Sequence, residues 1–143
     1  MHVTILSHAP AAIRRPILLA PVSVPAGFAS PAQDYYDGEL SLDEHLIEDR
    51  DATFVVRVSG HSMIAAGIFD GDELVVDRSK TPRDGDVVVA VLDGELTVKR
   101  LHVTRTGVVL QAENADYPDI EVPELSELTI FGCVTWSLHR LYR

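Results

Sequence analysis

DVVVAVLDGELTVKRL, residues 86–101, is the stretch that decides the fold. Its two apolar, β-branched runs flank Asp93-Gly94, a dipeptide typical of a two-residue turn in a β-hairpin. With a loop of that length, Val88 faces Lys99 across the two strands, and opposed residues project to the same side of a sheet. The hairpin therefore predicts that the Lys99 ammonium lies among aliphatic side chains, where desolvation lowers its pKa.

Short β-branched runs separated by turn residues continue on both sides of this hairpin. They are FVVRV (54–58), ELVVD (73–77), GVVLQA (107–112) and LTIFGCVTW (128–136). Regular punctuation of this kind predicts a mostly β fold, built as a curled sheet or partial barrel, and not alternating βαβ units. One short helix is predicted over residues 41–48, because Ser41 and Glu44 have the spacing of a capping box.

The first 31 residues differ from the rest of the chain. Prolines interrupt them at five positions, 10, 16, 21, 25 and 31. Because proline removes a backbone N–H and fixes φ, no helical or alternating pattern survives this spacing. We therefore expect a flexible, extended or irregular arm over residues 1–31, followed by one β domain over residues 32–143.

A secretory signal peptide is the alternative interpretation of this arm. Arg14-Arg15 precedes the apolar run ILLAPVSV, and residues 24–26 resemble a cleavage site. The apolar run is short, however, and is broken by Pro21, and the basic pair lies far from Met1, so the sequence favours a cytoplasmic protein. The single Cys133 allows no internal disulfide and suits a reducing compartment, as a buried, inert thiol.

Charge argues against nucleic acid as a direct partner, and the length of the apolar runs argues against a membrane span. The formal net charge is −10, and residues 1–26 hold two arginines and no acid, so the remainder carries −12. A body this acidic is a poor match for the phosphate backbone, so we expect no direct DNA binding. No apolar run approaches the ~20 residues that span a bilayer.

Ser62 and Lys99 are the candidate catalytic pair. Ser62 lies in SGHSM, directly after the expected strand FVVRV, where a turn would expose its hydroxyl and free the backbone N–H groups to hold an oxyanion. A lysine that loses its proton can act as the base that activates a serine. Each residue alone also has an ordinary structural interpretation, as a turn serine and as a surface lysine lying over apolar residues.

Other bases and metal sites were weighed against this pair. Lys80, the only other lysine, lies in the polar turn DRSKTPRDG and is expected to be solvated. A Ser–His–Asp triad remains an alternative: His61 adjoins Ser62, but neighbours in an extended chain point to opposite sides, and His102 follows as a second choice of base. Cys133 and His139 lack metal-ligand spacing, so we expect no metal, and no glycine-rich phosphate loop suggests a cofactor.

The same stretches carry a resemblance to a known family. SGHSMIAAGIFDGDELVVDRS, GDVVVAVLDGELTVKRL and IFGCVTW follow one another as in the LexA-like serine peptidases, and they resemble the UmuD type in particular. The similarity runs from about Pro25 to Val134 and includes VPAGFASPAQDYYDGELSLDEHLI, which is similar to the segment around the UmuD processing site. The separation of 37 positions between serine and lysine is that of the family.

This resemblance implies a mostly β fold with a curled sheet and self-cleavage by a serine–lysine dyad. Carried onto matching positions, it makes Ser62 the nucleophile and Lys99 the general base, with the backbone N–H groups of Ser62 and Met63 holding the oxyanion. Ala26 and Gly27 would flank the scissile bond.

Around that bond the chain both matches the family and departs from it. Val24 matches a valine that is common in the family, whereas Pro25 departs from it. Proline removes an N–H and restricts the residue before it, which would slow or redirect cleavage.

The resemblance also implies partners. Family members are usually homodimers whose cleavage is stimulated by the RecA–single-stranded DNA filament, and the UmuD type then serves an error-prone, UmuC-like translesion polymerase in the SOS response. The roughly thirty proline-rich residues before the β domain are too few and too broken for the helix-turn-helix of a repressor, so we expect the UmuD type and not a repressor. Two other functions stay open: a non-cleaving binding module of the same fold, and a peptidase that acts in trans on other proteins.

Overall fold

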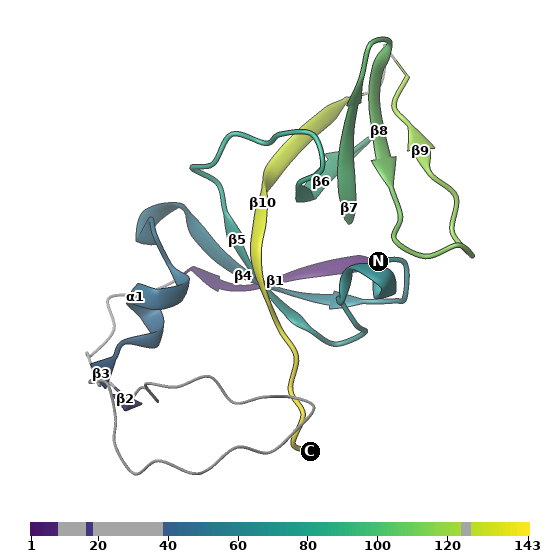
Figure 1. Cartoon of the computed structure of the whole chain (residues 1–143). Coiled ribbons are helices and arrows are strands. Elements are labelled where there is room, and N and C mark those ends of the chain that lie inside the picture. The colour runs from purple at the N-terminus through teal and green to yellow at the C-terminus, as the bar shows by residue number, and fades with distance from the viewer. Residues whose placement is uncertain (9–16, 19–38, 124–126) are drawn as a thin grey trace, which may run out of the picture. The chain divides into compact units, whose positions relative to one another are not determined.

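The structure is a computed structural model that describes residues 1–8, 17–18, 39–123 and 127–143. It divides into two compact units, one of Met1–Pro10 with Asp49–Arg143 and the other of Ala11–Glu48. The first unit contains the main sheet (Figure 1). No helix in the described part of the chain is long and apolar enough to cross a membrane.

One antiparallel sheet of eight strands forms the first unit, in the order β1-β4-β5-β10-β6-β7-β8-β9. The strands are β1 (His2–His8), β4 (Thr53–Ser59), β5 (Glu73–Asp77), β6 (Val87–Leu92), β7 (Glu95–Thr104), β8 (Gly107–Gln111), β9 (Ile120–Glu121) and β10 (Leu128–Leu138). Two short 3₁₀ helices, η1 (Arg50–Ala52) and η2 (Ile64–Ala66), flank β4. The prediction of a mostly β fold with a curled sheet is confirmed.

The long strand β10 joins the two halves of this sheet. Residues 128–133 pair with β6, and residues 133–138 pair with β5 (Figure 1). Register shifts occur between Ile130 and Gly132 and between Val134 and Trp136, so the strand bends where it passes from one half to the other. β10 therefore holds β1, β4 and β5 on one side and the hairpin of β6 and β7 on the other.

The hairpin has the register that its turn predicts. Asp93 and Gly94 both have positive φ, 49° and 84°, as a two-residue turn of type I′ requires. The pairs Leu92↔Glu95, Ala90↔Thr97 and Val88↔Lys99 follow from that turn, and all three are present.

Two clusters of buried apolar side chains form the core, on opposite faces of the hairpin of β6 and β7. Cluster 1 consists of Val56, Val58, Met63, Ile68, Leu74, Val76, Val89 and Val98. Cluster 2 consists of Val88, Ala90, Leu101, Leu110 and Cys133. Alternate residues of β6 and β7 enter alternate clusters, because successive side chains of a strand point to opposite faces. Lys99 is paired with Val88 and shares the strand face of Leu101, which is the face of β7 that cluster 2 covers.

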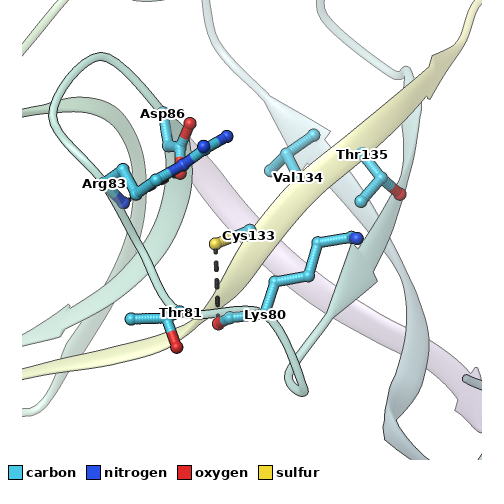
Figure 2. Close-up of a pocket in the computed structure, with 7 residues that line it drawn as sticks. All are labelled: Lys80, Thr81, Arg83, Asp86, Cys133, Val134 and Thr135. Carbon is cyan, nitrogen blue, oxygen red and sulfur yellow. Dashed lines mark hydrogen bonds between the residues drawn. The ribbon is translucent and has the colours of Figure 1, made fainter.

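Cys133 is buried, as the sequence predicts. Its thiol donates to the Lys80 carbonyl at 3.9 Å, beside a hollow that Arg83 and Asp86 also line (Figure 2). Burial, with the nearby Asp86 carboxylate next in importance, raises the pKa of this thiol. A thiol with a raised pKa stays protonated and is a poor nucleophile. Lys80 itself is exposed, as expected.

Strand β1 was not predicted. Residues 2–8 belong to the arm that the prolines were expected to keep extended or irregular, but they form an edge strand that pairs antiparallel with β4. The first pairs of the ladder are His2↔Ser59 and Val3↔Val58. This corrects the expectation for residues 2–8.

The second unit contains β2 (Ile17–Leu18), β3 (Glu39–Leu40) and α1 (Leu42–Leu46). The helix begins where the capping pattern predicts, since the Ser41 side chain accepts a hydrogen bond from the Glu44 N–H at 3.4 Å. None of its residues is buried, and Leu42 is 51% exposed.

Candidate active site

Ser62 lies in the turn that follows β4 and precedes η2. Gly60 enters this turn with φ of 99°, a conformation that glycine adopts without strain, and its N–H donates to Asp70 Oδ1 at 2.8 Å. The next residue after the serine, Met63, is fully buried in cluster 1 and anchors the turn. Ser62 is itself 0% exposed, so the predicted exposure of its hydroxyl is wrong for this conformation.

Lys99 reaches the same point from β7. Its Nζ lies 3.3 Å from Ser62 Oγ, 3.1 Å from Thr97 Oγ1 and 3.1 Å from the Val98 carbonyl oxygen. The lysine side chain is buried, with 5% exposure of the residue. The structure thus brings together the two residues that the sequence singled out, although 37 positions separate them.

Burial lowers the pKa of Lys99 from its ordinary value of 10.5. The charged amine can donate to all three oxygen atoms around it. After loss of one proton, the two remaining N–H bonds can serve Thr97 and Val98, and the nitrogen lone pair is then available to the Ser62 hydroxyl. This arrangement can take a proton from the serine and so generate a nucleophile.

The backbone beside the serine offers hydrogen-bond donors. Within the part of the chain that the structure describes, the N–H groups of Ser62 and Met63 donate to no backbone carbonyl. Met63 carries φ −122° and ψ 22° at the start of η2, and its own carbonyl accepts from the Ala66 and Ile68 N–H groups. Two adjacent N–H groups at a nucleophile can stabilise an oxyanion.

The loop after β8 clamps the serine turn on both sides. Asn114 Nδ2 donates to the His61 carbonyl at 2.7 Å, and the Ala65 N–H donates to the Glu113 carbonyl at 2.8 Å. The Asn114 amide is oriented for this contact because its Oδ1 accepts from the Asp116 N–H at 3.0 Å.

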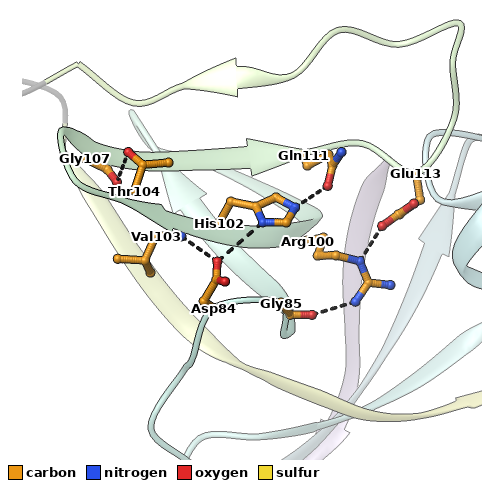
Figure 3. Close-up of polar contacts among 9 residues, drawn as sticks. All are labelled: Asp84, Gly85, Arg100, His102, Val103, Thr104, Gly107, Gln111 and Glu113. Atoms are coloured by element: carbon orange, nitrogen blue, oxygen red, sulfur yellow. Dashed lines mark hydrogen bonds and ion pairs between the residues drawn. The ribbon is translucent and has the colours of Figure 1, made fainter.

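The same loop is tied to the lysine strand. The Glu113 carboxylate pairs with Arg100, the residue after Lys99, and Arg100 also donates to the Gly85 carbonyl at 2.6 Å (Figure 3). The loop therefore links the turn that carries Ser62 to the strand that carries Lys99. We call Arg100, Glu113 and Asn114 the brace.

The histidines that the sequence offered as alternative bases lie elsewhere. His102 contacts Gln111 through Nε2, and its Nδ1 lies 3.4 Å from Asp84 (Figure 3). His139 pairs with the buried Asp72, and His61 is exposed. Among the residues that the structure describes, no hydrogen bond joins any of these three side chains to Ser62 or Lys99. Nor do three or more His, Cys, Asp or Glu side chains gather as a metal site among the described residues.

Two site residues were missed by the sequence analysis, and one group of predicted residues cannot be placed. Thr97 could have been found from its two-residue spacing to Lys99, which puts both side chains on one face of a strand. Asn114 gave no such signal, because its contact with the serine turn is purely tertiary. The predicted cleavage site, Ala26-Gly27 with its neighbours Val24 and Pro25, lies outside the described residues.

Comparison with known proteins supplies the family. The profile described as "Peptidase S24-like" matches residues 16–135. The chain belongs to the S24 peptidase family. These are serine peptidases, and the resemblance to LexA-like peptidases is thereby confirmed.

Individual S24 relatives cover most of the chain. The protein ImpA of Salmonella typhimurium is 46% identical over 115 residues, which are 80% of this chain and 78% of ImpA. The protein MucA of Escherichia coli is 46% identical over 116 residues, 80% of this chain and 79% of MucA. The LexA repressor of Magnetococcus marinus is 41% identical over 111 residues, 78% of this chain but 47% of the repressor.

Proposed function

We propose that this S24 peptidase cleaves its own chain at Ala26-Gly27 with a Ser62–Lys99 dyad. The observation that carries the proposal is the 3.3 Å contact between Lys99 Nζ and Ser62 Oγ at a buried position where the pKa of the amine is lowered. A serine next to a neutral amine has the chemistry of acyl transfer.

Cleavage begins when the neutral Lys99 amine removes the Ser62 hydroxyl proton and Oγ attacks the Ala26 carbonyl carbon. The N–H groups of Ser62 and Met63 hold the oxyanion that forms. Collapse of this intermediate breaks the C–N bond to Gly27, and the Lys99 ammonium returns the proton to the leaving amine. A water molecule, deprotonated by Lys99, then hydrolyses the acyl-serine and frees a new carboxylate at Ala26.

The substrate is a segment of the same chain, so the active site does not need a high affinity for it. Tethering keeps the scissile segment at an effective concentration of about a millimolar, so weak binding suffices. The small side chains of Ala26 and Gly27 allow the backbone to approach the serine closely. Pro25 restricts Val24 and sets the speed of cutting below that of a chain without proline there.

The cellular role that we propose follows the UmuD-type resemblance. Cutting is stimulated by the RecA–single-stranded DNA filament during the SOS response, and the shortened chain works as a homodimer that assists an error-prone, UmuC-like translesion polymerase. The similarity to ImpA and MucA over most of both chains supports the UmuD-type assignment. The net charge of −10 supports action through proteins rather than direct DNA contact.

Mass spectrometry after incubation in alkali tests the proposal. A fragment that begins at Gly27 is expected, first in alkali alone and then at neutral pH with RecA filament. A chain that stays intact in both conditions would support the non-cleaving binding module. Cutting of an unrelated protein without self-cutting would support the peptidase that acts in trans.

The brace leads to a prediction for Asn114. Alanine at this position removes the 2.7 Å hydrogen bond to the His61 carbonyl and loosens the turn that carries the serine. Misplacement of a reacting group by about 1 Å costs up to about 100-fold in rate, so we expect Asn114→Ala to slow self-cleavage by about tenfold. Cleavage rates measured across a pH series should keep their midpoint, because Lys99 is untouched.

Asp119→Ala, in an exposed part of the same loop, is the control and should cut at the parent rate. A midpoint that moves with Asn114→Ala would show that the residue acts on the charge of Lys99 and not on the position of the serine.

A further inference from the structure

The dyad is closed to substrate in this conformation. Ser62 is 0% exposed and Lys99 is 5% exposed, so no carbonyl carbon can reach Ser62 Oγ from outside. A chain that cuts itself therefore needs some element beside the dyad to move. The search for that element leads to β1, a strand held at the edge of the sheet.

β1 runs along the strand that leads to the serine. It pairs with β4 from Phe54 to Ser59, and Met1, the residue before β1, lies beside the serine turn: a Cβ built on Gly60 would lie 3.4 Å from Met1 Cα. Met1 also packs against cluster 1, which contains Met63. The start of β1 thus lies against the turn that presents the nucleophile.

β1 also contacts the strand that carries the base. It packs against β7, and Met1, His2 and Val3 line a cavity of about 480 Å³ together with Thr97, the hydrogen-bond partner of Lys99. Burial, followed by the nearby Lys99 charge, lowers the pKa of the Met1 α-amino group.

The position of β1 is the one that an extended substrate would need. β5 covers one edge of β4, and only the other edge, where β1 pairs, remains for a further strand. Peptides often bind by adding a strand to a sheet edge, through main-chain hydrogen bonds and pockets for alternate side chains. In β1 the half-buried Val3 fills such a position, and its neighbour Thr4 points to solvent.

We propose that the edge of β4 and the adjoining cavity are the binding site for the extended segment that Ser62 cuts, and that β1 occupies this site as an internal competitor. The assignment rests on the self-cleavage proposed above. The scissile segment has to displace β1 before its carbonyl reaches the serine. Cutting at residue 26 also severs β1 from the domain, so β1 then competes only as a separate peptide.

A matched pair of substitutions tests this. Val3→Asp places a carboxylate against the apolar cluster, opposite the buried Val58, and weakens the docking of β1. Thr4→Asp adds the same charge on the exposed face, opposite Arg57, and leaves docking intact. In alkali we expect Val3→Asp to cut at Ala26-Gly27 at least five times faster than the parent, and Thr4→Asp to stay within twofold.

Hydrogen exchange on Ser62→Ala chains, which remain whole, reports β1 directly. Residues 1–8 should be protected in the Ser62→Ala chain and in its combination with Thr4→Asp, and should exchange rapidly in its combination with Val3→Asp. A chain that begins at Ala9 is the second variant, since it removes β1 without burying a charge. It should also cut faster than the parent.

The possible results distinguish a failure of the β1 inference from a failure of the self-cleavage proposal. If Val3→Asp frees residues 1–8 but the cutting rate does not rise, β1 is no competitor, and the self-cleavage proposal stands. Unprotected residues 1–8 in the Ser62→Ala chain would overturn the inference in the same way. If no chain cuts even with β1 freed, the self-cleavage proposal fails, and the inference fails with it.

Discussion

Alanine in place of Ser62 or of Lys99 is expected to abolish self-cleavage at Ala26-Gly27. Removal of the nucleophile leaves no acyl intermediate, and a loss of at least about 1,000-fold follows from substitutions of this kind. Removal of the base costs about 100- to 10,000-fold, since general-base catalysis contributes that much. The Gly27 fragment, measured over time in alkali by mass spectrometry, gives both rates.

Lys80→Ala is the matched control, because Lys80 is the only other lysine in the chain and is exposed. It should cut at the parent rate. The double variant of Ser62 and Lys99 should lose no more activity than either single variant, because residues that act as one unit do not contribute additively. Wild-type cutting by Lys99→Ala would refute the dyad. His102 would then be the next base to test, although in this structure it contacts Gln111 and Asp84.

The second large effect is a steep dependence of the cutting rate on pH. Only the neutral form of Lys99 can accept the serine proton, and below its pKa the neutral fraction rises about tenfold with each pH unit. Because burial lowers this pKa from 10.5, the rate should reach half of its maximum at a pH below 10.5 and level off above that midpoint. Rates measured from pH 6 to 11 in the parent chain give the profile.

Stability provides a readout of the same pKa that does not depend on cutting. The unfolded lysine regains its ordinary pKa near 10.5, so between the lowered pKa and 10.5 the unfolded chain binds more protons than the folded one. The free energy of unfolding contributed by Lys99 therefore rises with pH in that window, by up to about 1.4 kcal/mol per pH unit, and falls as pH drops toward the lowered pKa.

Urea unfolding of Ser62→Ala, compared with Ser62→Ala/Lys99→Met, isolates this contribution. The double variant should gain stability relative to the single variant as pH falls through the window. A stability difference that is constant with pH, together with a flat rate profile, would show that Lys99 keeps its proton throughout and is not the base.

The sequence could reveal the buried position of Lys99 and its strand because that information is local. Asp93-Gly94 fixes the hairpin register, and the register alone pairs Lys99 with Val88. Burial of the serine could not be foreseen in the same way. A turn serine looks exposed from its neighbours, and the anchoring of Met63 in cluster 1 depends on strands far along the chain.

β1 shows where local patterns fail. Residues 2–5, HVTI, alternate polar and apolar side chains, which is a weak signal of a strand. The prolines from residue 10 onward, however, dominated the interpretation of the whole arm. What makes residues 2–8 a strand is the free edge of β4, and β propensity depends strongly on such pairing. The register shifts in β10 could not be predicted from the sequence either, because they depend on its pairing with β5 and β6.

The pairing of β10 with both β5 and β6 has a consequence for how this domain unfolds. Since one continuous strand supplies ladder partners to both halves, neither half can melt while the other keeps its full set of main-chain partners. A cut in the backbone within residues 128–138 should therefore unfold both halves of the sheet together. The proposed scissile bond after residue 26 lies far from β10 along the chain, so cleavage there is expected to leave the pairing of β10 with both halves of the sheet intact.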